Sequence, residues 1–242
     1  MSSLVISKGV IPYTEVPNVL TENKPVIFWD TCPLLYFNSI IERRAYREYE
    51  WDMKLLQLIE NGSVYSVTSS IVNQEFDKHH DSLRFHDEEK EKALGIAMGQ
   101  YGSIVGGQDE MDLQKGIGAL HLSAHMESMV TRLWRNTYVI DEDILFHKKA
   151  HNRVLGETPP CSEKQQYKDC YIWETFLSVC DNLANKGMAY YMTENTEDYC
   201  GKKSKTLLPD IQNELASHQG YLTITKCQLW VDIAKKLGLI PA

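Results

Sequence analysis

The sequence has no long hydrophobic run and no excess of basic residues. No apolar segment in its 242 residues approaches membrane-spanning length, and the first residues lack the hydrophobic core of a secretory signal. We therefore expect a cytoplasmic protein without membrane contact. The formal net charge of -8 argues against a protein that coats DNA nonspecifically, because such a protein needs a basic face. It does not exclude a nuclease, since carboxylates that hold metal ions contribute negative charge.

Cysteines at metal-binding spacing are also absent. The six cysteines are widely separated and include no Cys-x-x-Cys pair, which argues against a zinc ribbon or a disulfide framework. We expect reduced thiols that mostly pack in the core. Cys32 lies near Asp30 and could be a nucleophile, but without a placed histidine base packing is favoured. His121 and His125 lack the intervening acid of a zinc protease and are expected to be structural.

A short apolar run organises the chain. Residues 25–31 read Pro-Val-Ile-Phe-Trp-Asp-Thr, four consecutive apolar residues that end at a carboxylate. Such a run after a proline predicts a strand covered on both faces, as in the centre of a parallel sheet. Further strands are predicted at residues 63–68, 187–193 and 221–225, with amphipathic helices between them. We expect one α/β domain over residues 1–242.

The remaining segments are assigned more coarsely. Residues 1–24 are expected to form an arm packed across the domain. The stretch from about 84 to 160 is helical in pattern and too long for a simple crossover, so it is predicted as a long helical insertion over the sheet. Residues from about 206 to 242 are expected to add a strand and a closing helix.

Four acidic residues lie at positions where packing alone does not readily explain a carboxylate. Asp30 and Asp198 follow strands, Glu75 shares an apolar stripe with Ile71, and Asp169 lies at the start of a helix. The carboxyl ends of parallel strands share one edge of a sheet, so these acids can meet there. Clustered carboxylates repel one another unless cations neutralise them, and Mg²⁺ and Mn²⁺ prefer such ligands. This pattern is consistent with a metal site.

Other interpretations of the same residues stay open. Asp30 could cap the next helix, and Glu75 could belong to a buried salt bridge. Hydroxyl and amide groups close to the acids could orient them from outside the metal site; these are Thr31, Thr193 and Asn195. Three lysines after Asp198 could guide a phosphate backbone or form a solvated loop; these are Lys202, Lys203 and Lys205.

Taken in order, these motifs resemble those of PIN-domain nucleases, and most of all the larger PIN-like group with a long helical insertion before the third acid. Residues 28–31, 69–75, 168–174 and 192–199 carry the resemblance, which spans about residues 25 to 200. It implies a three-layer α/β/α fold with a central, mainly parallel sheet. It also implies cleavage of RNA, less often single-stranded DNA, that depends on Mg²⁺ or Mn²⁺.

The resemblance also assigns roles to residues. It implies that the catalytic and metal-site acids are Asp30, Glu75, Asp169 and Asp198, with Thr31 and Asn195 in support. Water activated by metal would then attack a phosphodiester and leave 5′-phosphate and 3′-hydroxyl ends. The family includes toxins and phage-defence effectors, which implies an antitoxin or other regulatory protein as a partner, and the resemblance suggests a homodimer. The chain departs from the family pattern at Cys32-Pro33 and in the added charges of Glu194 and Glu197.

Two other function classes compete with a metal-dependent endoribonuclease. Haloacid-dehalogenase-like phosphatases also begin at an Asp after a hydrophobic strand, but they need a second Asp two residues later, where this chain has Cys32. A nucleic-acid-binding or protein-docking module without catalysis is compatible with the acidic balance and the long helical stretch. Four acids in matching places favour the nuclease.

Overall fold

Six parallel strands form one sheet in the part of the chain that the computed structural model describes, which is residues 7–37, 46–105, 122–161, 167–183, 188–201 and 206–241. The spatial order of the strands is β1-β4-β3-β2-β5-β6. Their bounds are β1 (Gly9–Ile11), β2 (Val26–Trp29), β3 (Tyr65–Ser69), β4 (Thr137–Ile140), β5 (Ala189–Met192) and β6 (Tyr221–Thr223).

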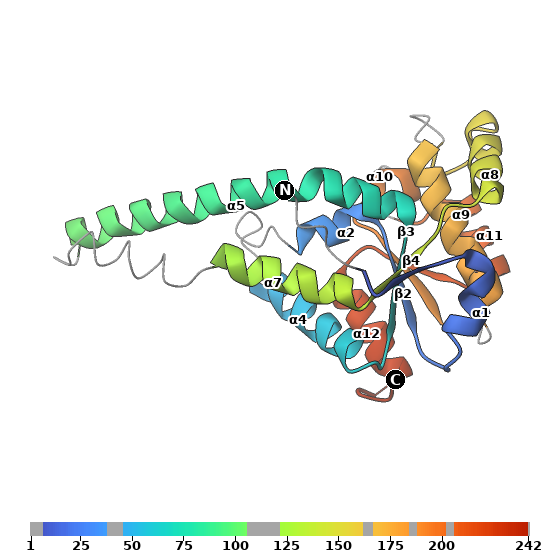
Figure 1. Ribbon diagram of the computed structural model, residues 1–242, viewed down its shortest axis with the longest axis horizontal. Helices are drawn as coiled ribbons and strands as arrows, with labels where there is room; N and C mark the ends of the chain where they lie inside the picture. Colours follow the sequence, from blue (N-terminus) through green and yellow to red (C-terminus); the bar gives the residue numbers. More distant parts are fainter. Residues whose placement is uncertain are drawn as a thin grey trace.

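Helices cover both faces of this sheet and complete a three-layer α/β/α fold (Figure 1). On one face α1, α8 and α11 pack with α9, and on the other α7 and α12 pack with α4. The helices are η1 (Tyr13–Glu15), α1 (Val16–Val19), α2 (Thr31–Tyr36), α4 (Tyr46–Glu60), α5 (Ser70–Val105), α7 (Leu122–Arg135), α8 (Ile144–Leu155), α9 (Tyr167–Asn182), α10 (Thr196–Tyr199), α11 (Pro209–His218) and α12 (Lys226–Lys236). The predicted fold class is confirmed.

Strand β2 lies at the centre of the sheet, as its apolar run predicts. All four of its residues are buried, and it pairs with β3 on one side and β5 on the other. In register, Trp29 lies opposite Thr68 of β3 and Met192 of β5. The three strands therefore end at the same level, and the residues that follow them meet at one edge of the sheet.

Two strands were not predicted, and each corrects an expectation. Strand β1 lies within residues 1–24, which therefore contribute an edge strand to the sheet in addition to η1 and α1. Strand β4 lies inside the stretch 84–160, so that stretch is not a helical insertion throughout. Strand β1 is a three-residue edge strand and β4 follows α7 after a single residue, so neither shows a periodic pattern distinct from its surroundings. Their places in the sheet come from tertiary pairing.

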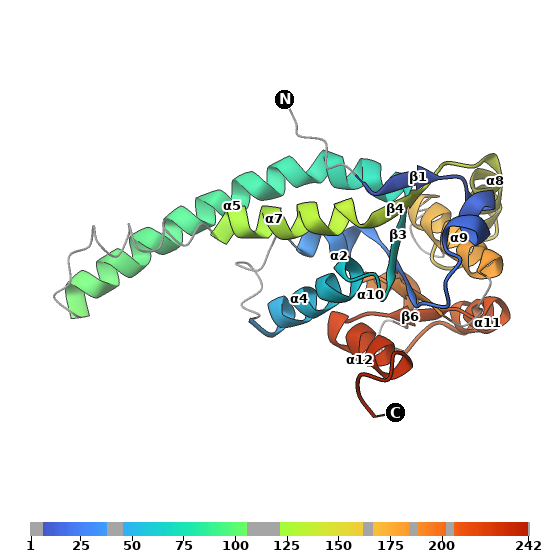
Figure 2. The same ribbon diagram turned by 60° about the horizontal axis from the view of Figure 1, so that its bottom comes forward.

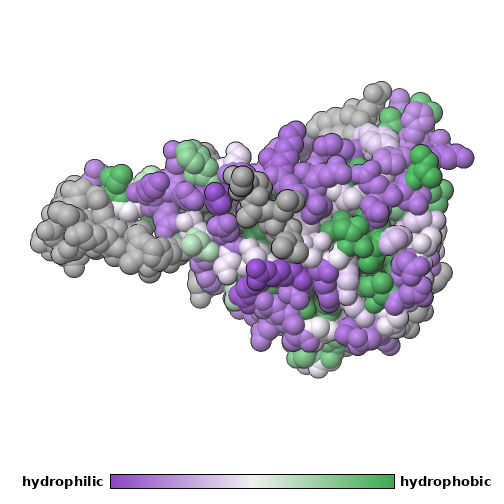
Figure 3. All heavy atoms as spheres, viewed as in Figure 1, coloured by the Kyte–Doolittle hydropathy of each residue, from purple (hydrophilic) through white to green (hydrophobic). Residues whose placement is uncertain are grey.

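Helix α5 extends beyond the sheet as a projecting arm. It is continuous over 36 residues, and α7 runs back alongside it (Figures 1 and 2). Hydrophilic side chains cover most of the face drawn in Figure 3, and the larger hydrophobic patches lie over the body rather than the arm. Within the described residues, no helix is both long enough and apolar enough to cross a membrane.

The two helices of the arm are joined where α7 begins. Glu91 of α5 accepts hydrogen bonds at Oε1 from the Leu122 amide (3.0 Å) and at Oε2 from the Ser123 amide (3.0 Å) and hydroxyl (2.6 Å). A carboxylate in this position satisfies otherwise unpaired amides and complements the helix dipole.

Replacing Glu91 with Ala should therefore lower the free energy of unfolding by about 1 kcal/mol, the usual cost of losing a helix cap. Urea unfolding of Glu91→Ala beside Glu91→Gln, which keeps an acceptor oxygen, measures this loss. Equal stability of Glu91→Ala and the wild type would show that the contact does not stabilise the arm.

A disulfide joins Cys161, which precedes α9, to Cys170, which lies in the first turns of α9. Their Cα atoms are 6.2 Å apart. The expectation of reduced thiols is wrong for this pair, while Cys32, Cys180 and Cys200 are free. Nothing in the spacing of the two half-cystines distinguishes them from the other cysteines, because the fold alone brings them together.

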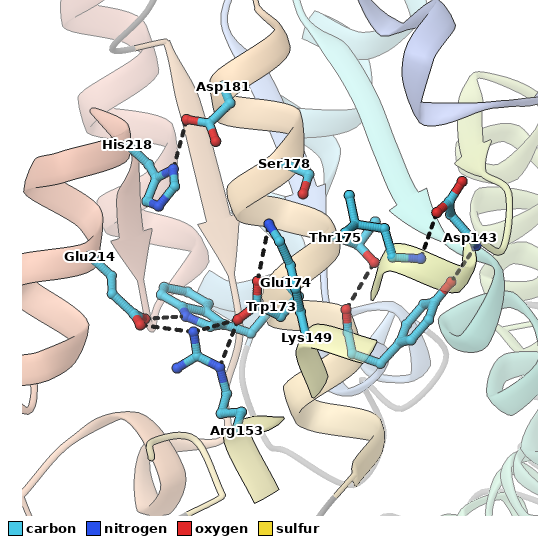
Figure 4. Close-up of polar contacts among 12 residues, drawn as sticks. Asp143, Lys149, Arg153, Trp173, Glu174, Thr175, Ser178, Asp181, Glu214 and His218 are labelled. Carbon is cyan, nitrogen blue, oxygen red and sulfur yellow. Dashed lines mark hydrogen bonds and ion pairs between the residues drawn. The ribbon is translucent and has the colours of Figure 1, made fainter. Parts of the chain in front are cut away.

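A buried ion-pair network fixes α9 against its neighbours (Figure 4). Arg153 of α8 is only 7% exposed, and its guanidinium donates to Glu174 of α9 (2.6 and 2.9 Å) and to Glu214 of α11 (2.8 Å). Trp173 of α9 donates its indole N–H to the other oxygen of Glu214 (2.7 Å). Charge-assisted hydrogen bonds of this kind are directional, so they set the position of the helix that carries Asp169.

Candidate functional site

Four elements that meet at the carboxyl edge of the sheet each contribute one acid. Asp30 follows β2 directly, Asp198 lies in α10 after β5, Glu75 lies near the start of α5 after β3, and Asp169 lies in the first turn of α9. These helix ends gather at the same end of the strands (Figure 1). The residues that the sequence analysis singled out thus come from distant parts of the chain to one place.

Asp30 both caps a helix and belongs to this cluster. Its Oδ1 accepts a hydrogen bond from the Thr31 amide (2.7 Å) at the start of α2, and its Oδ2 accepts one from the Thr193 hydroxyl (2.6 Å). The residue is 4% exposed. The two interpretations left open by the sequence are therefore compatible, since one oxygen caps the helix and the other is held by the neighbouring strand.

The pKa of Asp30 is raised from 3.8 to about 6: burial is the main cause, the hydrogen bonds from Thr193 and Thr31 oppose it, and the charges of Glu75 and Asp198 add to it. An aspartate placed in a low-dielectric region beside other carboxylates resists ionisation. Asp30 is thus a carboxyl group that needs positive charge nearby in order to stay ionised.

Both carboxylate oxygens of Glu75 are engaged. The Thr31 hydroxyl donates to Oε2 (2.7 Å), and the ammonium group of Lys168 lies 2.6 Å from Oε1. The Glu75 side chain is 21% exposed, and Lys168 is 57% exposed. A salt bridge at Glu75 was one of the two alternatives, and it is present, though at the rim of the cluster rather than in the core.

Asp198 is connected to Asp30 through a short chain of hydrogen bonds. Its Oδ2 accepts from the Asn195 side-chain amide (2.5 Å), and the Asn195 backbone amide donates to the Thr193 hydroxyl (3.0 Å). Thr193 in turn donates to Asp30. The hydroxyl and amide groups therefore contact the acids and orient them.

Asp169 completes the cluster by electrostatic interaction. Its pKa is raised from 3.8 to about 7, mainly by burial and in smaller part by the charges of Asp30, Asp198 and Glu75, while Lys168 lowers it. Each of the other three acids thus lies close enough to Asp169 to disfavour its ionisation. The four carboxyl groups therefore form one cluster of negative charge.

These pKa shifts predict how stability depends on pH in the metal-free protein. Because Asp30 and Asp169 hold their protons more tightly folded than unfolded, their contribution is fully present below about pH 4. It is lost as the pH rises through about 6 and 7. For Asp30 the loss is on the order of 3 kcal/mol.

Urea unfolding of the wild type and Asp30→Asn between pH 5 and pH 8 measures the Asp30 contribution together with its coupling to Asp169, because the Asp30 charge raises the pKa of Asp169. The variant should gain stability relative to the wild type as the pH rises. A difference that does not change with pH would show that Asp30 titrates normally.

Cys32 lies among the same charges. Its thiol pKa is raised to about 12, mainly by burial and in smaller part by the charges of Asp30, Glu194, Asp169 and Glu75. The thiolate form, which attacks electrophiles, is therefore scarce at neutral pH. This supports packing rather than nucleophilic catalysis at Cys32.

The donor set of the cluster fits a hard divalent cation. Its ligands are carboxylates with hydroxyl and amide groups behind them, the oxygen-rich chemistry that Mg²⁺ and Mn²⁺ select. Two of the acids keep raised pKa values, and a lysine ammonium group already lies against a third. As placed, however, no three His, Cys, Asp or Glu side chains of the described residues surround a common point closely enough to hold an ion. Binding would require the carboxylates to move toward each other.

The structure describes only some of the other residues discussed from the sequence. Lys202, Lys203, Lys205 and His121 fall outside the described residues. His125 forms a hydrogen bond with the Tyr49 hydroxyl (2.8 Å), in keeping with a structural role. Lys168 was not among the residues predicted from the sequence, although it stands next to Asp169.

Comparison with known proteins adds the family. No curated protein and no solved structure matches the chain. A family model for the PIN domain matches residues 27–199, a region that begins in β2 and ends in α10 and so includes all four clustered acids. Because this match covers most of the chain, the protein belongs to the PIN-domain family.

Proposed function

We propose that the protein is a metal-dependent endoribonuclease whose site is formed by Asp30, Glu75, Asp169 and Asp198. PIN domains are generally nucleases, which supports hydrolysis of phosphodiester bonds at the level of the family. The observation that carries the proposal is the convergence of four carboxyl groups from four elements, with the pKa of Asp30 raised to about 6 and that of Asp169 to about 7. Perturbed carboxyl groups that cluster at one sheet edge are typical of functional sites.

The residues of the chain would hold the site in place. Thr193 and the Thr31 amide fix both oxygens of Asp30, and Asn195 fixes one oxygen of Asp198. Such restraint reduces the reorganisation that a reacting group needs. A bound Mg²⁺ or Mn²⁺ ion would lower the pKa of a water ligand. It would also offset negative charge on the phosphate and on the leaving oxygen.

Substrate, partners and cellular role extend this proposal. RNA is the substrate that the family resemblance favours, with single-stranded DNA as the less frequent choice. Lys202, Lys203 and Lys205 follow the helix of Asp198 and would attract a phosphate backbone into an otherwise acidic region. A toxin or phage-defence role, control by an antitoxin or other regulatory protein, and assembly as a homodimer follow from the same resemblance.

The test is a cleavage assay on matched single-stranded RNA and DNA labelled at the 5′ end. We expect cleavage of RNA in Mg²⁺ or Mn²⁺, products with 5′-phosphate ends, and no cleavage in EDTA. Undiminished cleavage in EDTA would contradict the proposal. Binding without cleavage in either metal would favour a docking module, and turnover of a phosphate monoester through an aspartyl intermediate would favour a phosphatase.

A further inference from the structure

We propose that Lys168 is a resident cation of the acid cluster, and that a divalent metal ion binds by displacing its ammonium group from Glu75. The inference rests on the proposed metal-dependent function and identifies what competes with the metal. It concerns a residue to which neither the sequence motifs nor the family match assigns a role.

The ammonium group of Lys168 occupies the carboxylate oxygen of Glu75 that a metal ion would need as a ligand. Lys168 Nζ lies 2.6 Å from Oε1 of Glu75, while the Thr31 hydroxyl occupies Oε2. A Mg²⁺ ion binds carboxylate oxygens at about 2.0–2.1 Å and tolerates little distortion of its octahedral shell. A dication at that distance would lie within a few ångströms of the ammonium charge, and the two would repel. Glu75 therefore holds one or the other.

The same ammonium group acts on more than one acid. Lys168 lowers the pKa of Asp169, which burial and three carboxylates raise. A single positive charge thus offsets part of the repulsion that a divalent cation would otherwise relieve. The absence of a preassembled metal cluster among the described residues is consistent with side chains arranged around this smaller charge.

The ammonium group can leave at little cost. The Lys168 side chain is 57% exposed and rises from the first turns of α9, so displacement returns its charge to water. Ion pairs with this exposure contribute little to stability, because solvent screens them and the long side chain loses freedom when it is held. Loss of the Lys168–Glu75 pair should therefore cost little stability.

Mn²⁺ binding to the full-length protein, measured by isothermal titration calorimetry, tests the displacement. Lys168→Gln removes the charge and should bind Mn²⁺ roughly fivefold to tenfold more tightly than the wild type. Lys168→Arg keeps the charge and should bind like the wild type. Lys54→Gln is a matched control, since Lys54 pairs with Glu50 of the same helix at 2.7 Å rather than with the cluster, and its affinity should be unchanged.

A second background separates displacement from a general effect of charge. In Glu75→Gln the ion pair is already lost and only the effect of the ammonium charge on Asp169 remains, so adding Lys168→Gln should raise Mn²⁺ affinity by no more than about twofold. An equal gain in both backgrounds, or no gain in the single variant, would overturn the displacement while leaving the metal site intact. Failure of every variant and of the wild type to bind Mn²⁺ would overturn the proposed function, and the displacement with it.

Discussion

Replacing Asp30 with Asn is expected to abolish metal-dependent RNA cleavage, with a loss on the order of 10³-fold or more in kcat/KM. The substitution removes the buried charge that a divalent cation would need, but it keeps an oxygen that can accept from the Thr31 amide. Asn caps helices about as well as Asp, so the fold should persist. The measurement is cleavage of labelled RNA in Mg²⁺, together with circular dichroism of the same preparation.

Asp143 provides the matched control for this variant. It is also an N-cap aspartate, accepting from the Leu145 amide (2.7 Å) at the start of α8, but it is not one of the four clustered acids. Asp143→Asn makes the same chemical change at a comparable helix end and should keep its activity. Full activity in Asp30→Asn would show that the reaction does not need the Asp30 carboxylate, and it would contradict the proposed site.

The second large effect concerns stability and lies away from the acid cluster. Lys226 at the start of α12 and Asp52 of α4 form an ion pair with 2.5 Å between Nζ and Oδ1, and their side chains are only 2% and 1% exposed. The ammonium group also lies 4.1 Å from the centroid of the Phe37 ring. Removing one partner leaves a buried charge without compensation, so Asp52→Asn should lower the free energy of unfolding by about 3–5 kcal/mol.

Urea unfolding measures this loss, and a double variant identifies its cause. Asp52→Asn with Lys226→Met removes both charges and should recover much of the stability, because buried ion pairs add little beyond what apolar packing supplies. A loss below about 1 kcal/mol in Asp52→Asn, or no recovery in the double variant, would show that the pair is not isolated from water.

The centre of the fold could be predicted because its signal is local. The apolar run of β2 is unbroken and ends at Asp30, so strand, burial and position at the sheet edge all follow from one segment. Strands β1 and β4 were missed because β1 is a three-residue edge strand and β4 follows α7 after a single residue, so only the pairing of β4 with β1 and β3 sets them apart. The disulfide between Cys161 and Cys170 also depends on tertiary structure, so the sequence alone did not reveal it.

Some features of the candidate site could likewise be predicted from the sequence, and others could not. The acids and the hydroxyl and amide groups follow strand ends or helix starts, and the structure brings Asp30, Thr31 and Thr193 into direct contact. Their catalytic roles stay predictions. The engagement of Glu75 by Lys168 was out of reach, because it joins two residues 93 positions apart through a helix orientation that Arg153 helps to fix.

The most direct test is a crystal structure of the protein soaked in Mn²⁺, with data collected at the manganese absorption edge. We predict an anomalous peak at the carboxyl edge of the sheet, within ligand distance of Asp30 and of at least one more of the four clustered acids. A saturating soak with no peak beside Asp30, or with manganese bound only elsewhere, would contradict the metal site on which the proposed function depends.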